Sequence, residues 1–183
     1  MNEVAERLAG SLVRADEAAG ADPVAREFEA RLADSSTLAF RVAYSVLRQR
    51  EDAEDVAQEA FLRAHRRFAQ LRDRAAFRGW LVRLTFRIAL DRRRSDRRRA
   101  VREVDVLPMA TLPRPDELAL TAERAARLWA AIDTLPEKLR LVTVLAAIEG
   151  QELSEVARLT GAPVGTVKSR LFDARRLLAE RLR

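Results

Sequence analysis

The closing stretch of the chain, GAPVGTVKSRLFDARRLLAERL, constrains the fold more than any other part of the sequence. At about 100° per residue, one narrow face collects its apolar side chains, as in a helix packed on a core: Val167, Leu171, Ala174 and Leu178. The opposite face collects Gly165, Lys168, Ser169, Phe172 and Arg176. An aromatic ring on the face that points away from the core indicates a partner outside that core.

The residues before this helix predict a helix-turn-helix. A short helix over 153–160 ends at Gly161, and glycine suits the left-handed C-cap because it has no Cβ to strain. Pro163 suits the first turn of the next helix, where its missing N–H is no loss. In this motif the second helix enters the major groove of DNA, and Lys168, Ser169 and Phe172 suit phosphates and base edges. The alternative is an ordinary helical hairpin, with a solvated basic face and Phe172 beneath a neighbouring loop.

The composition extends the helical prediction to the whole chain. Hydrophobic residues make up 48% of the sequence but aromatic residues only 5%, a mix that favours amphipathic helices over sheets. We expect further helices over about 24–47, 53–71, 76–98, 115–134 and 136–148. Three prolines between 101 and 115 break the periodicity and predict a linker. The expected fold class is therefore all-α, with two small helical domains joined by a flexible linker.

The charge distribution predicts a polyanionic partner. Basic residues exceed acidic ones by 34 − 28 = 6, and residues 77–99 hold nine arginines against two acids. Aromatic residues beside arginines can hold single-stranded or distorted DNA, but Phe77 and Trp80 are more typical of a core. A soluble surface rich in arginine is the alternative explanation of the charge excess.

A second predicted surface is acidic. The sequence REDAEDVAQEAFLRAHRRF carries a buried stripe that includes Val56, Ala60 and Phe68, and five acids within 51–59. Acids at a helix start oppose the helix dipole favourably, but five exceed that need. In a basic DNA-binding chain, such a patch indicates a basic protein partner.

The sequence also excludes several classes of function. The absence of cysteines excludes disulfides, thiol redox chemistry and cysteine–zinc sites within this sequence. One histidine and surface acids form no convincing catalytic or metal constellation, so we expect no enzyme, catalytic residue, metal or cofactor. No apolar run approaches about 18 residues and no signal peptide is recognisable. We therefore expect a cytoplasmic, nucleoid-associated protein without membrane insertion.

In combination, three motifs resemble those of bacterial RNA polymerase sigma factors of the extracytoplasmic-function (ECF) group. They are EDAEDVAQEAFLRAHRRF, FRGWLVRLTFRIALDRRR and EVARLTGAPVGTVKSRLFDARRLL, in the family's order. The resemblance implies an N-terminal extension over 1–25, helical or disordered, sigma domain 2 over 26–99, a linker over 100–116, and sigma domain 4 over 117–183. It also implies a transcription initiation factor that directs core RNA polymerase to specific promoters, controlled by an anti-sigma factor.

The resemblance assigns a role to residues in each motif. The acidic helix would dock on the β′ coiled coil of core polymerase, and domain 4 would contact the β flap; the docking residues are Asp52, Asp55, Gln58, Glu59 and Arg63. Domain 2 would melt and capture the −10 element of promoter DNA through Arg72, Asp73, Arg74, Phe77, Arg78, Trp80, Arg83 and Arg87. The last helix would read the −35 element through Val164, Thr166, Lys168, Ser169, Phe172, Asp173, Arg175 and Arg176.

The chain departs from the family pattern at a few positions. Glu152 replaces the usual serine N-cap, so the first helix of the helix-turn-helix is expected to start loosely. Asp173 stands where a basic residue is common, and His65 stands where an aromatic is common and is expected to pack. Residues 1–25 are either a regulatory arm or a frayed tail. The alternative function is a stand-alone helix-turn-helix regulator, which leaves the acidic helix unexplained.

Overall fold

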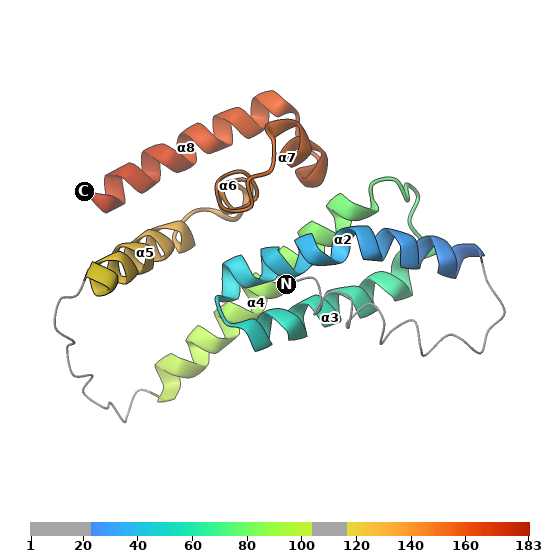
Figure 1. Cartoon of the computed structure of the whole chain (residues 1–183), viewed down its shortest axis with the longest axis horizontal. Helices are drawn as coiled ribbons and strands as arrows, with labels where there is room; N and C mark the ends of the chain where they lie inside the picture. Colours follow the sequence, from blue (N-terminus) through green and yellow to red (C-terminus); the bar gives the residue numbers. More distant parts are fainter. Residues whose placement is uncertain (1–22, 104–116) are drawn as a thin grey trace.

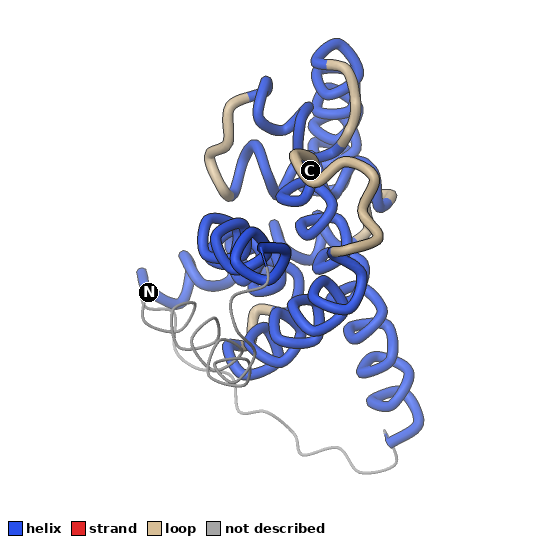
Figure 2. The backbone as a smooth tube through the Cα atoms, turned by 90° about the vertical axis from the view of Figure 1, so that its right-hand side faces the viewer, coloured by secondary structure: helices blue, strands red, loops and turns tan. Residues whose placement is uncertain are grey.

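The structure is a computed structural model that describes residues 23–103 and 117–183. Every regular element in these two ranges is a helix (Figure 2), which confirms the all-α expectation. The predictions that concern residues 1–22 and 104–116 lie outside the described residues. They include most of the N-terminal extension and of the flexible linker.

The first block is a bundle of three helices, α2 (Pro23–Leu47), α3 (Arg50–Phe68) and α4 (Phe77–Glu103), each packed on the other two (Figure 1). The predicted stripe of α3 is buried: Val56, Ala57, Ala60, Phe61, Ala64 and Phe68. Phe28, Phe68 and Phe77 meet edge to face, with ring centroids 5.2 to 5.9 Å apart. This phenylalanine trio joins all three helices in a geometry that aromatic rings prefer.

The second block contains α5 (Glu117–Asp133), α6 (Glu137–Thr143), the π-helical turn η1 (Val144–Ile148), α7 (Leu153–Thr160) and α8 (Val164–Leu182). The sequence predicted one helix over 136–148, whereas the structure widens its last turn. The Glu149 N–H donates to the carbonyl oxygen of Val144 at 2.9 Å, five residues back. Four consecutive residues at the junction of α6 and η1, 142–145, are buried.

Most helix boundaries agree with the prediction to within a few residues. α3 begins at Arg50, three residues before the predicted start, so that Glu51 and Asp52 lie in its first turn. α4 reaches Glu103 and therefore includes residues 100–103, which were predicted to belong to the linker. Arginine has a high helix propensity, and the arginine-rich end of α4 continues the helix for that reason.

The two blocks pack against each other. α7 lies on α4, η1 lies on α2, and buried residues of both blocks, such as Leu81 and Leu159, belong to one hydrophobic cluster. The sequence predicted two domains but gave no sign of this contact. The first helix of the helix-turn-helix therefore lies against α4, which carries several of the residues predicted to bind DNA.

Candidate nucleic-acid interface

The helix-turn-helix forms as predicted in α7 and α8. Gly161 ends α7 in the left-handed region, with φ 67° and ψ 30°, and the Ala162 N–H donates to the Ala157 carbonyl at 3.1 Å. Pro163 lies one residue before α8, as its N-cap, and its carbonyl accepts from the Val167 N–H at 3.0 Å. Glu152, the N-cap of α7, makes no side-chain capping bond.

The two faces of α8 differ in burial as the sequence predicted. Val167, Leu171 and Ala174 are buried, and Leu178 is half-buried. On the other side Phe172 is 67% exposed, so no neighbouring loop covers it. Five further predicted −35 residues are exposed around it: Val164, Lys168, Ser169, Arg175 and Arg176. We call these six residues the α8 outer face.

Among the described residues, few contacts compete for the α8 outer face. The Ser169 hydroxyl donates back to the Gly165 carbonyl at 2.9 Å, which leaves its oxygen free to accept. Arg176 lies 3.5 Å from Glu180, an exposed pair one helical turn apart that contributes little. Thr166 and Asp173 are half-buried at the edge of the face. The structure thus brings the predicted −35 residues together on one side of a rigid helix.

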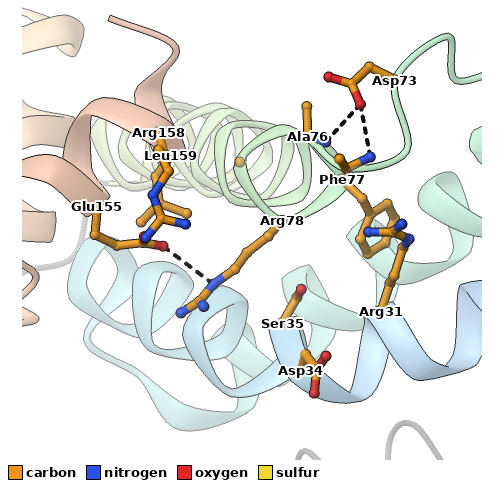
Figure 3. A pocket seen from close by; sticks show the side chains of 12 residues that line it. Arg31, Asp34, Ser35, Asp73, Ala76, Phe77, Arg78, Glu155, Arg158 and Leu159 are labelled. Carbon is orange, nitrogen blue, oxygen red and sulfur yellow. Dashed lines mark hydrogen bonds and ion pairs between the residues drawn. The ribbon is translucent and has the colours of Figure 1, made fainter. Parts of the chain in front are cut away.

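The residues predicted to read the −10 element lie in two different settings. Arg72 and Arg87 are exposed and Trp80 is half-buried. The Asp73 carboxylate accepts from the N–H groups of Ala75 and Ala76, at 2.9 and 3.4 Å, and thereby orders the loop before α4 (Figure 3).

Arg74 is anchored beside this loop. Its guanidinium donates to Glu27 at 2.8 Å and lies 5.3 Å from the centre of the Phe68 ring. The hydrogen bonds from Arg74 and Arg31 lower the pKa of Glu27 below its ordinary value. The side chain of Arg74 is thus held at the base of the loop by an acid that the sequence analysis did not select.

Phe77 requires a correction. Its side chain is 1% exposed and packs against Phe28, Phe68 and Trp80, so it belongs to the core rather than to a DNA-contacting surface. The sequence analysis also noted that Phe77 is more typical of a core, and the structure places it there. A large apolar ring at the first position of α4 gains more from burial than it could gain on a solvated face.

Arg78 and Arg83 both contact the helix-turn-helix, although the Arg78 side chain stays 44% exposed. The Arg83 guanidinium donates to the Leu159 carbonyl at 2.6 Å, and its burial lowers the pKa of Arg83. The Arg78 guanidinium lies 3.8 Å from the Glu155 carboxylate (Figure 3). Two of the arginines predicted to contact the −10 element therefore make contacts with the other block.

The acidic surface on α3 forms as predicted. Asp55, Gln58, Glu59 and Arg63 are exposed, and Glu59 pairs with Arg63 one turn along. Leu62, which the sequence analysis did not select, is 46% exposed among them and adds apolar area to this surface. Asp52 is half-buried and pairs with Arg92 of α4 at 3.0 Å. His65 packs edge to face on Phe28, with ring centroids 5.2 Å apart, in agreement with the packing role expected for it.

The sequence analysis missed a group of charged residues between the blocks. The Asp133 carboxylate, at the end of α5, accepts from Arg48 at 2.6 and 2.7 Å and from Arg93. We call these three residues the Asp133 cluster. Their positions in the sequence give no sign that they meet, since 85 residues separate Arg48 from Asp133.

Neither a metal site nor a membrane span is found in the described ranges. No group of three or more histidine or acidic residues there could hold a metal ion. No helix there is long and apolar enough to cross a membrane.

Comparisons with known proteins match both blocks. The family model for sigma-70 region 2 matches residues 33–99, and the model for sigma-70 region 4 matches residues 125–178. The chain is 34% identical over 149 residues to the ECF RNA polymerase sigma factor SigE of Mycolicibacterium smegmatis, covering 78% of this chain and 56% of that protein. It is 33% identical over 134 residues to the ECF RNA polymerase sigma-E factor of Escherichia coli, covering 68% of this chain and 70% of that protein.

Solved structures share the helical fold. The sigma factor RpoE of Bartonella quintana, crystallised with the anti-sigma factor NepR, aligns with a TM-score of 0.54 at 23% identity, covering 86% of this chain and 97% of that one. CnrH, in complex with the cytosolic domain of CnrY, aligns with a TM-score of 0.55 at 23% identity, covering 98% of this chain and 94% of that one.

Proposed function

This chain belongs to the sigma-70 family, in the extracytoplasmic-function group of RNA polymerase sigma factors, and from that premise we propose that it binds core polymerase and directs it to specific promoters. The observation that carries the proposal is the α8 outer face: an exposed aromatic ring with cationic side chains on the second helix of a helix-turn-helix. This surface suits the major groove of a −35 element. The stand-alone regulator is set aside, because family models match the first block as well as the second.

Domain 2 would supply the −10 function. Arg72 and Arg87 are exposed, Asp73 orders the loop, and Trp80 lies at its border. Arginines beside a partly exposed aromatic ring can hold the phosphates and bases of a separated strand. Extruding a base costs stacking energy, which contacts with such a loop offset.

The acidic surface on α3 would dock on the β′ coiled coil of core polymerase, and domain 4 would contact the β flap. Asp55, Gln58 and Glu59 are exposed on one face of α3, where Glu59 pairs with Arg63 of the same helix. Leu62 supplies apolar area at the same place, as the centre of a protein interface requires. An anti-sigma factor is expected to control the protein, as the names of the structural relatives indicate for those proteins.

Co-elution with core polymerase and promoter-specific transcription in vitro test this function. The promoters used in this assay are identified by mapping transcript starts after overexpression of the chain. Asp55→Arg should abolish co-elution and transcription while the protein stays folded. Asp91→Arg is the matched control, since Asp91 is an exposed acid of the same domain on a different helix. Co-elution that survives Asp55→Arg would remove this residue from the docking surface, and an absence of co-elution for the unaltered chain would refute the proposed function.

A further inference from the structure

Two further arginines extend the Asp133 cluster. The Arg140 guanidinium donates from Nη2 to the backbone carbonyl of Asp133. Burial lowers the pKa of Arg140, and the nearby Asp133 carboxylate opposes that shift. The positive charges of Arg93, Arg94 and Arg48 lower it further, so these guanidiniums lie close by. We call Arg48, Arg93, Arg94 and Arg140 the arginine group.

The arginine group carries more positive charge than its acidic partners balance. Arg48 and Arg93 share the Asp133 carboxylate. Arg94 lies 3.5 Å from Asp91, an exposed pair on one helix that contributes little. Within the described part of the chain, the ion pairs of the group thus supply two carboxylates, one of them exposed, for four guanidiniums. Since arginine stays charged at any physiological pH, this excess favours a bound anion.

The group also has hydrogen-bond donors that the Asp133 cluster does not use. Arg48 donates to both Asp133 oxygens from a single nitrogen, Nη2, which leaves its Nη1 and Nε donors unused by the cluster. Among the described residues, the Nε of Arg140 is buried and has no hydrogen-bond partner. A buried N–H without a partner is costly, and it indicates a site that a water molecule or an ion completes.

The backbone at Arg48 indicates that the position requires a guanidinium. Among the described residues, Arg48 is the one non-glycine residue with a positive φ, at 59°. Glycine adopts this left-handed conformation without strain, whereas a side chain is disfavoured there. Its guanidinium lies 4.8 Å from the centre of the Trp129 ring, which helps to fix its direction. Backbone strain of this kind is typical of functional sites.

The burial of the group favours a small anion over a long polyanion. The side chains of Arg48 and Arg93 are only 27% and 34% exposed. Contacts with a DNA backbone are made by side chains that project into solvent, as on the α8 outer face. Partly buried guanidiniums attract an anion more strongly than solvated ones do, and their planar pairs of N–H groups match the oxygens of a phosphate.

We propose that the arginine group is a binding site for a small polyphosphate, whose oxygens accept from the donors that Asp133 leaves unused. A polyphosphate carries several negative charges, so it offsets the excess that one half-buried carboxylate leaves. The site lies outside the residues assigned to promoter DNA and to core polymerase, and the inference does not rest on the proposed function. The phosphate group is the part that the arginines recognise, so pyrophosphate is the probe.

Calorimetric titration of the full chain with pyrophosphate, at constant ionic strength, tests the site. We expect saturable binding that Arg48→Gln weakens at least about tenfold, because a partly buried charge is lost. Arg94→Gln is a second variant, which keeps the fold because its side chain is 63% exposed, and it should weaken binding by about three- to tenfold. Arg66→Gln is the matched control, with the same change of charge at an exposed position of α3, and should leave binding unchanged.

Asp133→Asn distinguishes a ligand site from a purely structural ion pair. Removal of the carboxylate leaves the arginines uncompensated, so the melting temperature should fall. Pyrophosphate should then bind at least about tenfold more tightly, and should restore the melting temperature by more than it raises that of the unaltered chain. Glu123→Gln, which removes an exposed acid of the same helix, is the control and should show neither effect.

The remaining outcomes overturn the proposal. Binding that Arg48→Gln and Arg94→Gln reduce no more than Arg66→Gln does would place the anion elsewhere. Loss of binding in Lys168→Ala, with no effect of Arg48→Gln, would place it on the α8 outer face. A fall in the melting temperature of Asp133→Asn that pyrophosphate does not reverse would leave the cluster a structural contact only. An absence of saturable binding to the unaltered chain at millimolar pyrophosphate would exclude the site outright.

Discussion

Two neighbouring residues of α8 should differ in how replacement by alanine divides between lost stability and lost DNA binding. Leu171 is 6% exposed, and truncation of a buried leucine costs about 2 to 5 kcal/mol in the free energy of unfolding. Phe172 is 67% exposed, so the protein covers about a third of its ring. A fully enclosed aromatic residue buries roughly 150 to 250 Å², so the covered third of Phe172 amounts to about 60 Å². At about 25 cal/mol per Å², the burial of this area contributes about 1.5 kcal/mol to the free energy of unfolding. Alanine returns about 0.5 kcal/mol through its helix propensity, which leaves a net cost of about 1 kcal/mol.

The effect of Phe172→Ala on DNA should be the larger one. Loss of a contact with a base edge or a thymine methyl costs about 1 to 3 kcal/mol, or about 5- to 150-fold in affinity for the −35 duplex. The assays are urea denaturation of the free chain and binding of the polymerase complex to a promoter mapped by its transcript start. Leu171→Ala should destabilise the protein strongly, and its DNA binding should fall only as far as the folded fraction falls. The reasoning is refuted if Phe172→Ala leaves −35 binding unchanged, or destabilises the fold as much as Leu171→Ala does.

Three further outcomes are expected. Lys168→Ala should reduce the slope of log affinity against log salt concentration by about 0.9, because one phosphate contact is lost. The control variant Lys138→Ala, at an exposed position on α6, should leave this slope unchanged. Asp173→Asn should change the base preference within the −35 element more than the overall affinity, as measured with a set of duplexes varied one position at a time. Arg74 and Arg31 lower the pKa of Glu27 in the folded protein. The ionised Glu27 carboxylate therefore stabilises the fold above the ordinary glutamate pKa of about 4.3, and this stabilisation is lost as the pH falls through the lowered pKa. Glu27→Gln should therefore lower the melting temperature at pH 7, and the gap from the unaltered chain should close below about pH 4; a gap that persists at pH 2 would contradict this assignment.

Local features of the helices could be predicted from the sequence because they depend on neighbouring residues. The spacing of Val167 and Leu171 placed Phe172 on the outer face of α8, and Gly161 and Pro163 marked the turn before it. Contacts between distant segments could not be predicted in this way. Nothing near Arg83 indicates that its partner is the carbonyl of Leu159, since the bond depends on the packing of α4 against α7.

The structure also decides between roles that the sequence left open. An aromatic residue beside arginines suits either a core or a base platform, and only the packing of Phe28 and Phe68 around Phe77 assigns it to the core. The π-helical turn at Val144–Ile148 was missed because hydrophobic periodicity does not distinguish a single wide turn from an α-helical one. For Asp133, the residues that give it a role lie in another block of the chain.

The phenylalanine trio has a consequence for how promoter choice can change over generations. Phe68 ends α3 and Phe77 begins α4, and their rings touch edge to face at 5.3 Å, so the ends of the intervening loop, residues 69–76, are fixed by the core. Arg72 and Asp73 lie in that loop and are exposed. Under the proposed function, substitution of Arg72 would alter what the loop recognises at little cost to the stability of the bundle, whereas Asp73 also orders the loop through its bonds to Ala75 and Ala76. In that case one helical scaffold could acquire new target sequences through a few exchanges in a loop whose ends the core holds in place.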